Sequence, residues 1–224
     1  MPPEGGLAAC YCSGVDFVEP ARPIALELIG GRGHYERVVR AVMNARASVW
    51  IATANLKELM VEDDRAAPGR RRTMRVGSRA ARAYRSVMDV LDELAGRGVE
   101  LRILHAGLPS RAFRAAVIEK PRLARGALAL RACPRVHFKI VVVDGAFVYI
   151  GSANWTGAGL GAKGTGRRNF ELGFAGSDDG LLDRAQEMFD RVWRGAACKG
   201  CRLRDVCPAP LDGQPPPGRR SGPA

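Results

Sequence analysis

The feature that most constrains the fold is a pair of short apolar segments, 136–143 and 147–150, joined by Asp144-Gly145. An Asp-Gly pair between two such segments is the strongest local signal for a β-hairpin, because both residues tolerate the positive φ angles of the tightest turns. Both segments are rich in β-branched or aromatic residues, which favour strands. The sequence therefore predicts two antiparallel strands here.

Four polar side chains flank this hairpin at equal spacing. Alternate residues of a strand share a face, so His137 and Lys139 are expected to project to one side. Ser152 and Asn154 repeat the two-residue spacing after the second strand, and Gly151 allows close approach of the backbone. A nucleophile, a cation, a hydroxyl and an amide can converge on one tetrahedral anion. This set favours phosphoryl chemistry by covalent catalysis without a metal.

The rest of the chain predicts an α/β fold. A helix over 80–95 ends at Gly96 and Gly98, and a strand over 99–104 follows at once. A helix followed by a strand after a short glycine turn is typical of α/β domains. The other expected elements are strands over 24–29, 48–53 and 170–174 and helices over 35–47, 110–119 and 179–194.

The length of 224 residues favours one domain with a substantial core. We expect an N-terminal segment over 1–29, a catalytic domain over 30–195, and a cysteine cluster with a disordered Pro/Gly-rich tail over 196–224. No apolar run is long enough for a transmembrane segment, and the first residues lack the layout of a signal peptide. The expected location is the cytoplasm.

The balance of 35 Lys and Arg against 23 Asp and Glu gives a formal charge of +12. Such a charge favours a polyanionic partner, either nucleic acid or an anionic membrane surface. The alternative is a bias in base composition, which also enriches arginine. The densest basic run contains the candidate substrate-binding residues Arg70, Arg71, Arg72 and Arg75. They either bind phosphate or form a solvated face.

The spacing of the hairpin residues resembles the signature of the phospholipase D superfamily, His-x-Lys-x4-Asp-x6-Gly-Ser-x-Asn. All six fixed positions are filled, by His137, Lys139, Asp144, Gly151, Ser152 and Asn154. The resemblance extends loosely over most of residues 30–194. It implies a mixed β-sheet flanked by helices on both faces and a phosphodiesterase that needs no cofactor for catalysis.

The resemblance also implies a role for each site residue. His137 is the expected nucleophile of a phosphohistidine intermediate, Lys139 and Asn154 hold the phosphoryl oxygens, and Ser152 supports them. The expected role of Asp144 is structural. Glu171 matches the position from which members with a single motif orient the histidine; its alternative is an ordinary strand carboxylate.

The mechanism needs a second histidine as general acid and base. His34 and His105, the other two histidines, have no lysine two residues on, so the chain holds one motif. We expect a two-fold homodimer in which His137 of each subunit meets at the axis. Single-motif members are typically nucleases or small phosphodiesterases, so the first expectation is an endonuclease on DNA or RNA. The alternatives are a lipid phosphodiesterase and a non-catalytic nucleic-acid-binding module.

Six cysteines are many for a cytoplasmic protein. The spacing C-x2-C-x5-C near the C-terminus suits a metal or cluster, and the N-terminal C-x-C pair can supply a fourth thiolate. The candidate ligands are Cys198, Cys201, Cys207, Cys10 and Cys12. The spacing resembles the iron–sulfur site of certain DNA-processing nucleases; structural zinc and unliganded thiols or disulfides are the alternatives. Cys133 is expected to be a small core residue.

Overall fold

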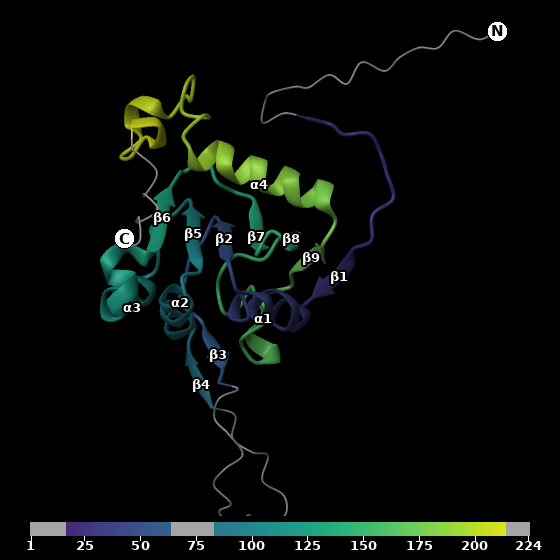
Figure 1. Cartoon of the computed structure of the whole chain (residues 1–224), viewed down its shortest axis with the longest axis vertical. Helices are drawn as coiled ribbons and strands as arrows, with labels where there is room; N and C mark the ends of the chain where they lie inside the picture. Colours follow the sequence, from purple (N-terminus) through teal and green to yellow (C-terminus); the bar gives the residue numbers. More distant parts are fainter. Residues whose placement is uncertain (1–16, 64–82, 214–224) are drawn as a thin grey trace, which may run out of the picture.

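A mixed sheet of seven strands organises the chain, whose computed structural model describes residues 17–63 and 83–213 (Figure 1). The strand order is β1-β9-β8-β7-β2-β5-β6. The strands are β1 (Glu27–Gly30), β2 (Ser48–Thr53), β5 (Glu100–His105), β6 (Leu128–Ala132), β7 (Lys139–Val143), β8 (Phe147–Gly151) and β9 (Leu172–Gly176). β2, β5 and β6 run parallel, and every other neighbouring pair is antiparallel.

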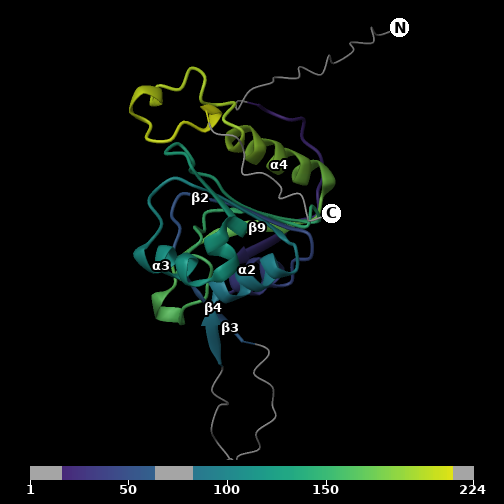
Figure 2. The same cartoon turned by 60° about the vertical axis from the view of Figure 1, so that its left-hand side comes forward.

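Helices cover both faces of this sheet, as predicted. α4 (Asp179–Trp193) lies on one face, and α1 (Arg40–Met43), α2 (Val87–Gly96) and α3 (Arg111–Glu119) lie on the other (Figure 2). A π-helical turn over Tyr35–Val39 leads into α1. Within residues 17–63 and 83–213, no helix is long and apolar enough to cross a membrane.

Each face of the sheet has its own apolar core. On the α4 side, the rings of Trp50, Phe189 and Trp193 stack in a row, with centroids 5.3 Å and 5.4 Å apart. On the other side, Val141 and Tyr149 pack with residues of α1, α2 and α3. Side chains that alternate along β7 and β8 therefore enter opposite cores, which fixes the register of the hairpin.

Several elements differ from the expected ones. The helix expected over 80–95 begins at Val87, where the Ser86 hydroxyl accepts a hydrogen bond from the Met88 N–H and caps it. The preceding residues form β4 (Tyr84–Ser86), which pairs with β3 (Met60–Glu62) in a separate two-stranded sheet. β6 was not expected at all.

The first strand crosses the expected domain boundary at residues 29 and 30. β1 (Glu27–Gly30) pairs antiparallel with β9 and is the outermost strand of the seven-stranded sheet. The seven-stranded sheet therefore includes residues on both sides of that boundary.

The turn of the β7–β8 hairpin has the expected geometry. Asp144 and Gly145 both have positive φ, 56° and 62°, as a type I′ turn requires. The Asp144 carboxylate accepts hydrogen bonds from the backbone N–H groups of Arg46, Ala47 and Ser48, at 2.7–3.1 Å. Desolvation alone would raise the pKa of Asp144, but these three donors lower it below its usual value. Asp144 thus ties the hairpin to the start of β2.

Replacing Asp144 tests this tie. We expect Asp144→Ala to lower the free energy of unfolding by about 2 kcal/mol, because three backbone donors lose a charged acceptor. The folded-state pKa is depressed, so the contribution is present above the unfolded pKa of about 4 and is lost as the pH falls through the folded value. Urea unfolding at pH 7 and near pH 3 measures both effects. Asp183→Ala, at an exposed position of α4, is the control; an equal loss in both variants would contradict the assignment.

Candidate active site

Five of the six motif residues, all except Asp144, gather at one edge of the sheet. The parallel strands β2 and β5 end there, with Thr53 opposite His105, while β7 begins and β8 ends at the same edge. Lys139, the first residue of β7, pairs with Gly151, the last of β8. The edge at the carboxyl ends of parallel strands is where open α/β sheets commonly bind ligands.

His137 and Lys139 supply a nucleophile and a cation. His137 is exposed and lies two residues before β7, outside the strand in which the sequence predicted it. Lys139 is only 9% exposed. Its ammonium donates a hydrogen bond of 2.7 Å to the His137 carbonyl and lies 3.4 Å from Nδ1 of the same residue. A buried positive charge therefore stands directly beside the imidazole.

Hydrogen bonds from Thr53 and Asn55 fix the orientation of the Asn154 side chain. Its Oδ1 accepts a hydrogen bond of 3.0 Å from the Asn55 N–H, and the Thr53 hydroxyl lies 3.2 Å from the same oxygen. A backbone N–H can only donate, so the amide oxygen must face β2. The Nδ2 donors are turned away from these partners and are available to an anion. The sequence had not singled out Thr53 as the residue that holds this amide.

Ser152 and Glu171 form a second polar pair. The Ser152 hydroxyl donates to a Glu171 carboxylate oxygen and accepts a hydrogen bond of 3.1 Å from the Leu172 N–H. The Asn169 side chain donates to the other oxygen of Glu171 at 3.0 Å. Across residues 17–63 and 83–213 no hydrogen bond joins Glu171 to His137. Glu171 therefore contacts Ser152 and Asn169, and its expected role toward the imidazole stays a prediction.

Gly151 allows the close packing on which this edge depends. A Cβ at this position would lie 2.4 Å from the Tyr149 hydroxyl and 2.7 Å from the Gly173 Cα, closer than real Cβ atoms approach. The Tyr149 hydroxyl lies beneath the site and accepts a hydrogen bond of 3.2 Å from the Ala153 N–H. Burial raises the pKa of Tyr149 to about 12, so the phenol stays neutral near pH 7.

The other two histidines are buried. His34 and His105 are 0% and 7% exposed, and their Nδ1 atoms lie 3.3 Å and 2.9 Å from the carbonyls of Gly31 and Gly107. Burial lowers the pKa of both imidazoles. His137 is therefore the single exposed imidazole among the three histidines, and one chain supplies one histidine to the site.

A polar cavity of about 200 Å³ adjoins Asn154. Two exposed lysines, Lys57 and Lys163, line it together with Asn55 and Asn169. The sequence did not predict this set, because its members come from separate loops and share no spacing. The cavity places two further cations beside the motif.

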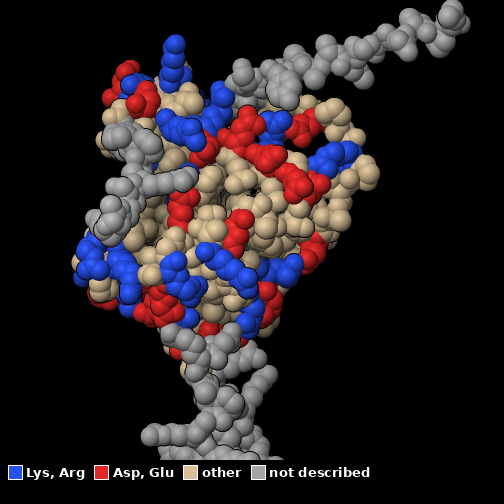
Figure 3. Space-filling view, in the orientation of Figure 1, with Lys and Arg blue, Asp and Glu red and all other residues tan. Residues whose placement is uncertain are grey.

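The arginine run lies outside the described residues, and so do Arg70, Arg71, Arg72 and Arg75. Residues 64–82 hold seven arginines against one aspartate, which is half of the formal excess of +12. In the described part, basic and acidic side chains are interspersed on the face shown in Figure 3. Several arginines among the described residues form ion pairs, for example Arg37 with Glu27 and Arg122 with Asp92.

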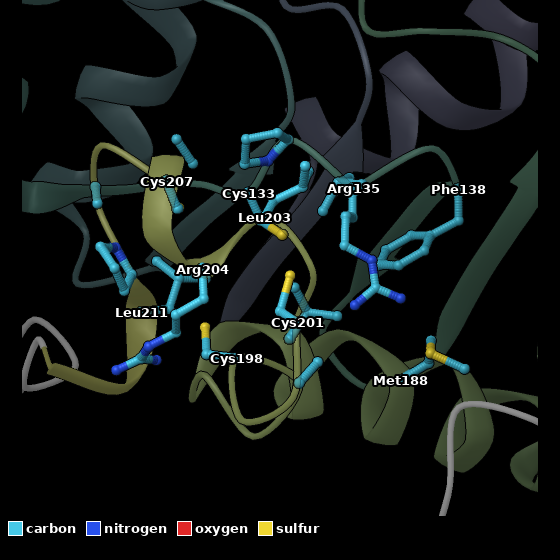
Figure 4. Close-up of a pocket in the computed structure, with 17 residues that line it drawn as sticks. Cys133, Arg135, Phe138, Met188, Cys198, Cys201, Leu203, Arg204, Cys207 and Leu211 are labelled. Carbon is cyan, nitrogen blue, oxygen red and sulfur yellow. The ribbon is translucent and has the colours of Figure 1, made fainter.

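The three C-terminal cysteines share a cavity with Cys133. Cys198, Cys201 and Cys207 line one cavity together with Cys133 (Figure 4). Cys133 is half-buried and packs against the α4-side core, and it also faces this cavity. Within residues 17–63 and 83–213, no three thiols, imidazoles or carboxylates are arranged to hold a single metal ion. The other two candidate ligands, Cys10 and Cys12, lie outside the described residues.

An apolar patch borders Ser152. It consists of four exposed side chains: Leu28 on β1, Leu172 and Phe174 on β9, and Phe170 two residues before β9. Leu28 and Phe174 are opposite one another in the strand register, and Leu172 is two residues from Phe174 and shares its face. The Leu172 backbone bonds Ser152 through both its N–H and its carbonyl.

The fold of this chain is similar to that of solved structures. Nuc from Salmonella typhimurium, described as a phospholipase D family member, is 19% identical, with a TM-score of 0.50 over 76% of this chain and 95% of Nuc. NucT from Helicobacter pylori is 14% identical, with a TM-score of 0.49 over 75% of this chain and 94% of NucT.

No curated protein matches the chain in sequence. The family model described as "Cardiolipin synthase, PLD-like domain" matches residues 71–193, which is more than half of the sequence. That region contains every residue of the motif at the sheet edge. The chain belongs to the family of phospholipase-D-like domains.

Proposed function

We propose that this protein is a phosphodiesterase that cleaves DNA or RNA as an endonuclease, through a phosphohistidine on His137 in a homodimer. The observation that carries the proposal is the exposed His137 imidazole beside the buried Lys139 ammonium, with the Asn154 donors oriented by Thr53 and Asn55. Mere binding of phosphate needs no nucleophile, so a non-catalytic module does not account for this arrangement.

The reaction proceeds in two displacements. An unprotonated nitrogen of His137 attacks phosphorus and forms a P–N bond while the P–O bond to the leaving group breaks. The departing oxygen takes a proton from the imidazolium of the partner subunit's His137. That imidazole, now neutral, accepts a proton from a water molecule whose oxygen attacks phosphorus and releases His137.

The other residues of the site stabilise the negative charge of the transition state. Lys139 neutralises a phosphoryl oxygen at short range, and its burial strengthens this interaction because little water screens it. The Asn154 amide donates to a second oxygen. Ser152, held by Glu171, lies at the same edge and donates once phosphate competes for its hydroxyl. No step requires a cofactor.

The second histidine comes from a second copy of the chain. His34 and His105 are buried and held by carbonyls, so neither reaches a leaving group at the sheet edge. The apolar patch beside Ser152 offers a surface on which two copies can pack around a two-fold axis. Leu28, Phe174 and Leu172 share one face of the β1–β9 pair, so they can form one continuous contact surface.

Nucleic acid is the favoured substrate because positive charge extends beyond the motif. Lys57 and Lys163 stand beside Asn154, where they can contact phosphates flanking the scissile one. The arginine run over 64–82 adds half of the net charge. A lipid phosphodiesterase is the second candidate, favoured by the family model, whose description names cardiolipin synthase.

Loss of the nucleophile should abolish cleavage. We expect His137→Ala to reduce kcat at least about 1,000-fold, because the covalent path is removed. Wild-type activity should persist in EDTA, and brief incubation with internally ³²P-labelled oligonucleotide followed by denaturation should leave a labelled nucleotide fragment joined to His137 by an acid-labile P–N bond. Glu171→Gln, which keeps a hydrogen-bond acceptor for Ser152, should lose far less activity. Unchanged cleavage by His137→Ala would rule out the mechanism.

The dimer can be tested through the apolar patch. We expect Leu172→Glu with Phe174→Glu to give a monomer by light scattering, because charges at an apolar interface cannot be buried unpaired. Activity should fall with the dimer fraction. Ile118→Glu, at an exposed apolar position on α3, is the control and should remain dimeric and active. A fully active monomer would contradict the proposal.

The two lysines separate the substrate classes. We expect Lys57→Ala with Lys163→Ala to raise the Kd for single-stranded DNA or RNA and to reduce the slope of log K against log salt by about 1 to 2, because up to two phosphate contacts are lost. Fluorescence anisotropy at several salt concentrations measures this slope, with exposed Arg111→Ala as control. Hydrolysis of phosphatidyl vesicles but of no nucleic acid would instead support the lipid phosphodiesterase.

A further inference from the structure

Four thiols from two distant parts of the chain line one cavity of about 200 Å³ (Figure 4). Cys133 follows β6, whereas Cys198, Cys201 and Cys207 follow α4 in the segment that closes the cavity. All four side chains are half-buried and unpaired by disulfides. They lie near enough to one another that the charge of each of the other three acts on Cys133. The fold thus collects four soft ligands at one point.

Two of these cysteines sit in the same local backbone arrangement. Cys133 opens a turn in which the Val136 N–H donates to its carbonyl at 2.9 Å, and Cys201 opens a turn in which the Arg204 N–H does so at 2.9 Å. In each turn the N–H two residues on, that of Arg135 or Leu203, donates to the cysteine sulfur. Backbone hydrogen bonds to sulfur stabilise the thiolate that binds a metal.

Arginines surround the thiols. The Arg135 side chain donates to the Cys201 sulfur, and the charges of Arg131 and Arg204 act on Cys198. Arg131 is only 4% exposed and donates to the carbonyls of Trp193 and Leu211, so it also ties β6 to the C-terminal segment. Positive charge of this kind offsets the negative charge of metal-bound thiolates.

Among the described residues, the four thiols are not arranged around a single ion. Tetrahedral zinc with Zn–S bonds of about 2.3 Å would bring its sulfurs within roughly 4 Å of one another. Here no three described thiols stand close enough to share one ion, yet all four border the same cavity. A cluster spreads its ligands over several metal atoms. Apolar side chains such as Phe138, Met188 and Leu203 complete the lining.

We infer that Cys133, Cys198, Cys201 and Cys207 are the four ligands of an iron–sulfur cluster. Cys133 takes the place that the sequence had given to Cys10 or Cys12. The cluster has a structural role that does not depend on the proposed nuclease activity. Cys133 lies four residues before His137, so a cluster here would fix the loop that carries the nucleophile to the C-terminal segment.

The full-length protein, purified without oxygen, tests the ligand set. We expect about four iron and four sulfide per chain and a broad absorbance near 400 nm. Alkylation of the native wild-type protein followed by mass spectrometry should leave these four cysteines protected while Cys10 and Cys12 are modified. This measurement needs no variant and so does not depend on whether a substituted chain folds.

Variants then distinguish the two candidate sources of the fourth ligand. Cys133→Ser should lose most of the iron and the absorbance, whereas Cys10→Ser with Cys12→Ser, the matched control, should keep both. Circular dichroism checks that each variant is folded. One zinc per chain and no iron would overturn the cluster, and four alkylated thiols in metal-free protein would overturn the site. Iron lost only from the N-terminal double variant would overturn the assignment of Cys133.

Discussion

The antiparallel pairing of β7 with β8 determines where every polar group of the motif stands. Lys139 is opposite Gly151, so the residues before β7 and after β8 emerge at the same edge. A slip of one residue would exchange the two cores of the sheet, because alternate side chains enter opposite faces. Asp144 fixes the turn at the far end by accepting three backbone N–H groups. The hairpin therefore fixes the relative positions of the site residues.

This edge of the sheet lacks one group that the proposed mechanism needs, a second histidine. It offers an exposed imidazole, a buried ammonium and an oriented amide, but the chain has no second histidine that reaches solvent. A two-displacement mechanism needs an acid for the leaving group and a base for water. In the proposed dimer, symmetry would supply both, because each of the two copies contributes His137. The proposed dimer would bury the apolar patch around Leu172 and Phe174, which explains why this patch is exposed in a single chain.

The sequence predicted what depends on neighbouring residues and missed what depends on distant ones. The hairpin and β2 follow from local pattern and turn chemistry, and both were found. β6 and the pairing of β3 with β4 depend on distant strands, which local pattern does not show. The same limit explains why Glu171 was expected to orient His137 although it bonds Ser152, and why Cys133 was not linked to cysteines more than sixty residues away.

In the proposed dimer, two identical imidazoles flank one phosphorus. A crystal structure of the protein with bound orthovanadate, which mimics the five-coordinate transition state, tests it most directly. We expect one vanadium per dimer on a two-fold axis, with the His137 rings of both subunits on opposite sides and Lys139 and Asn154 on the equatorial oxygens. Vanadate bound in each subunit alone, with the two rings far apart and no common cavity, would contradict it.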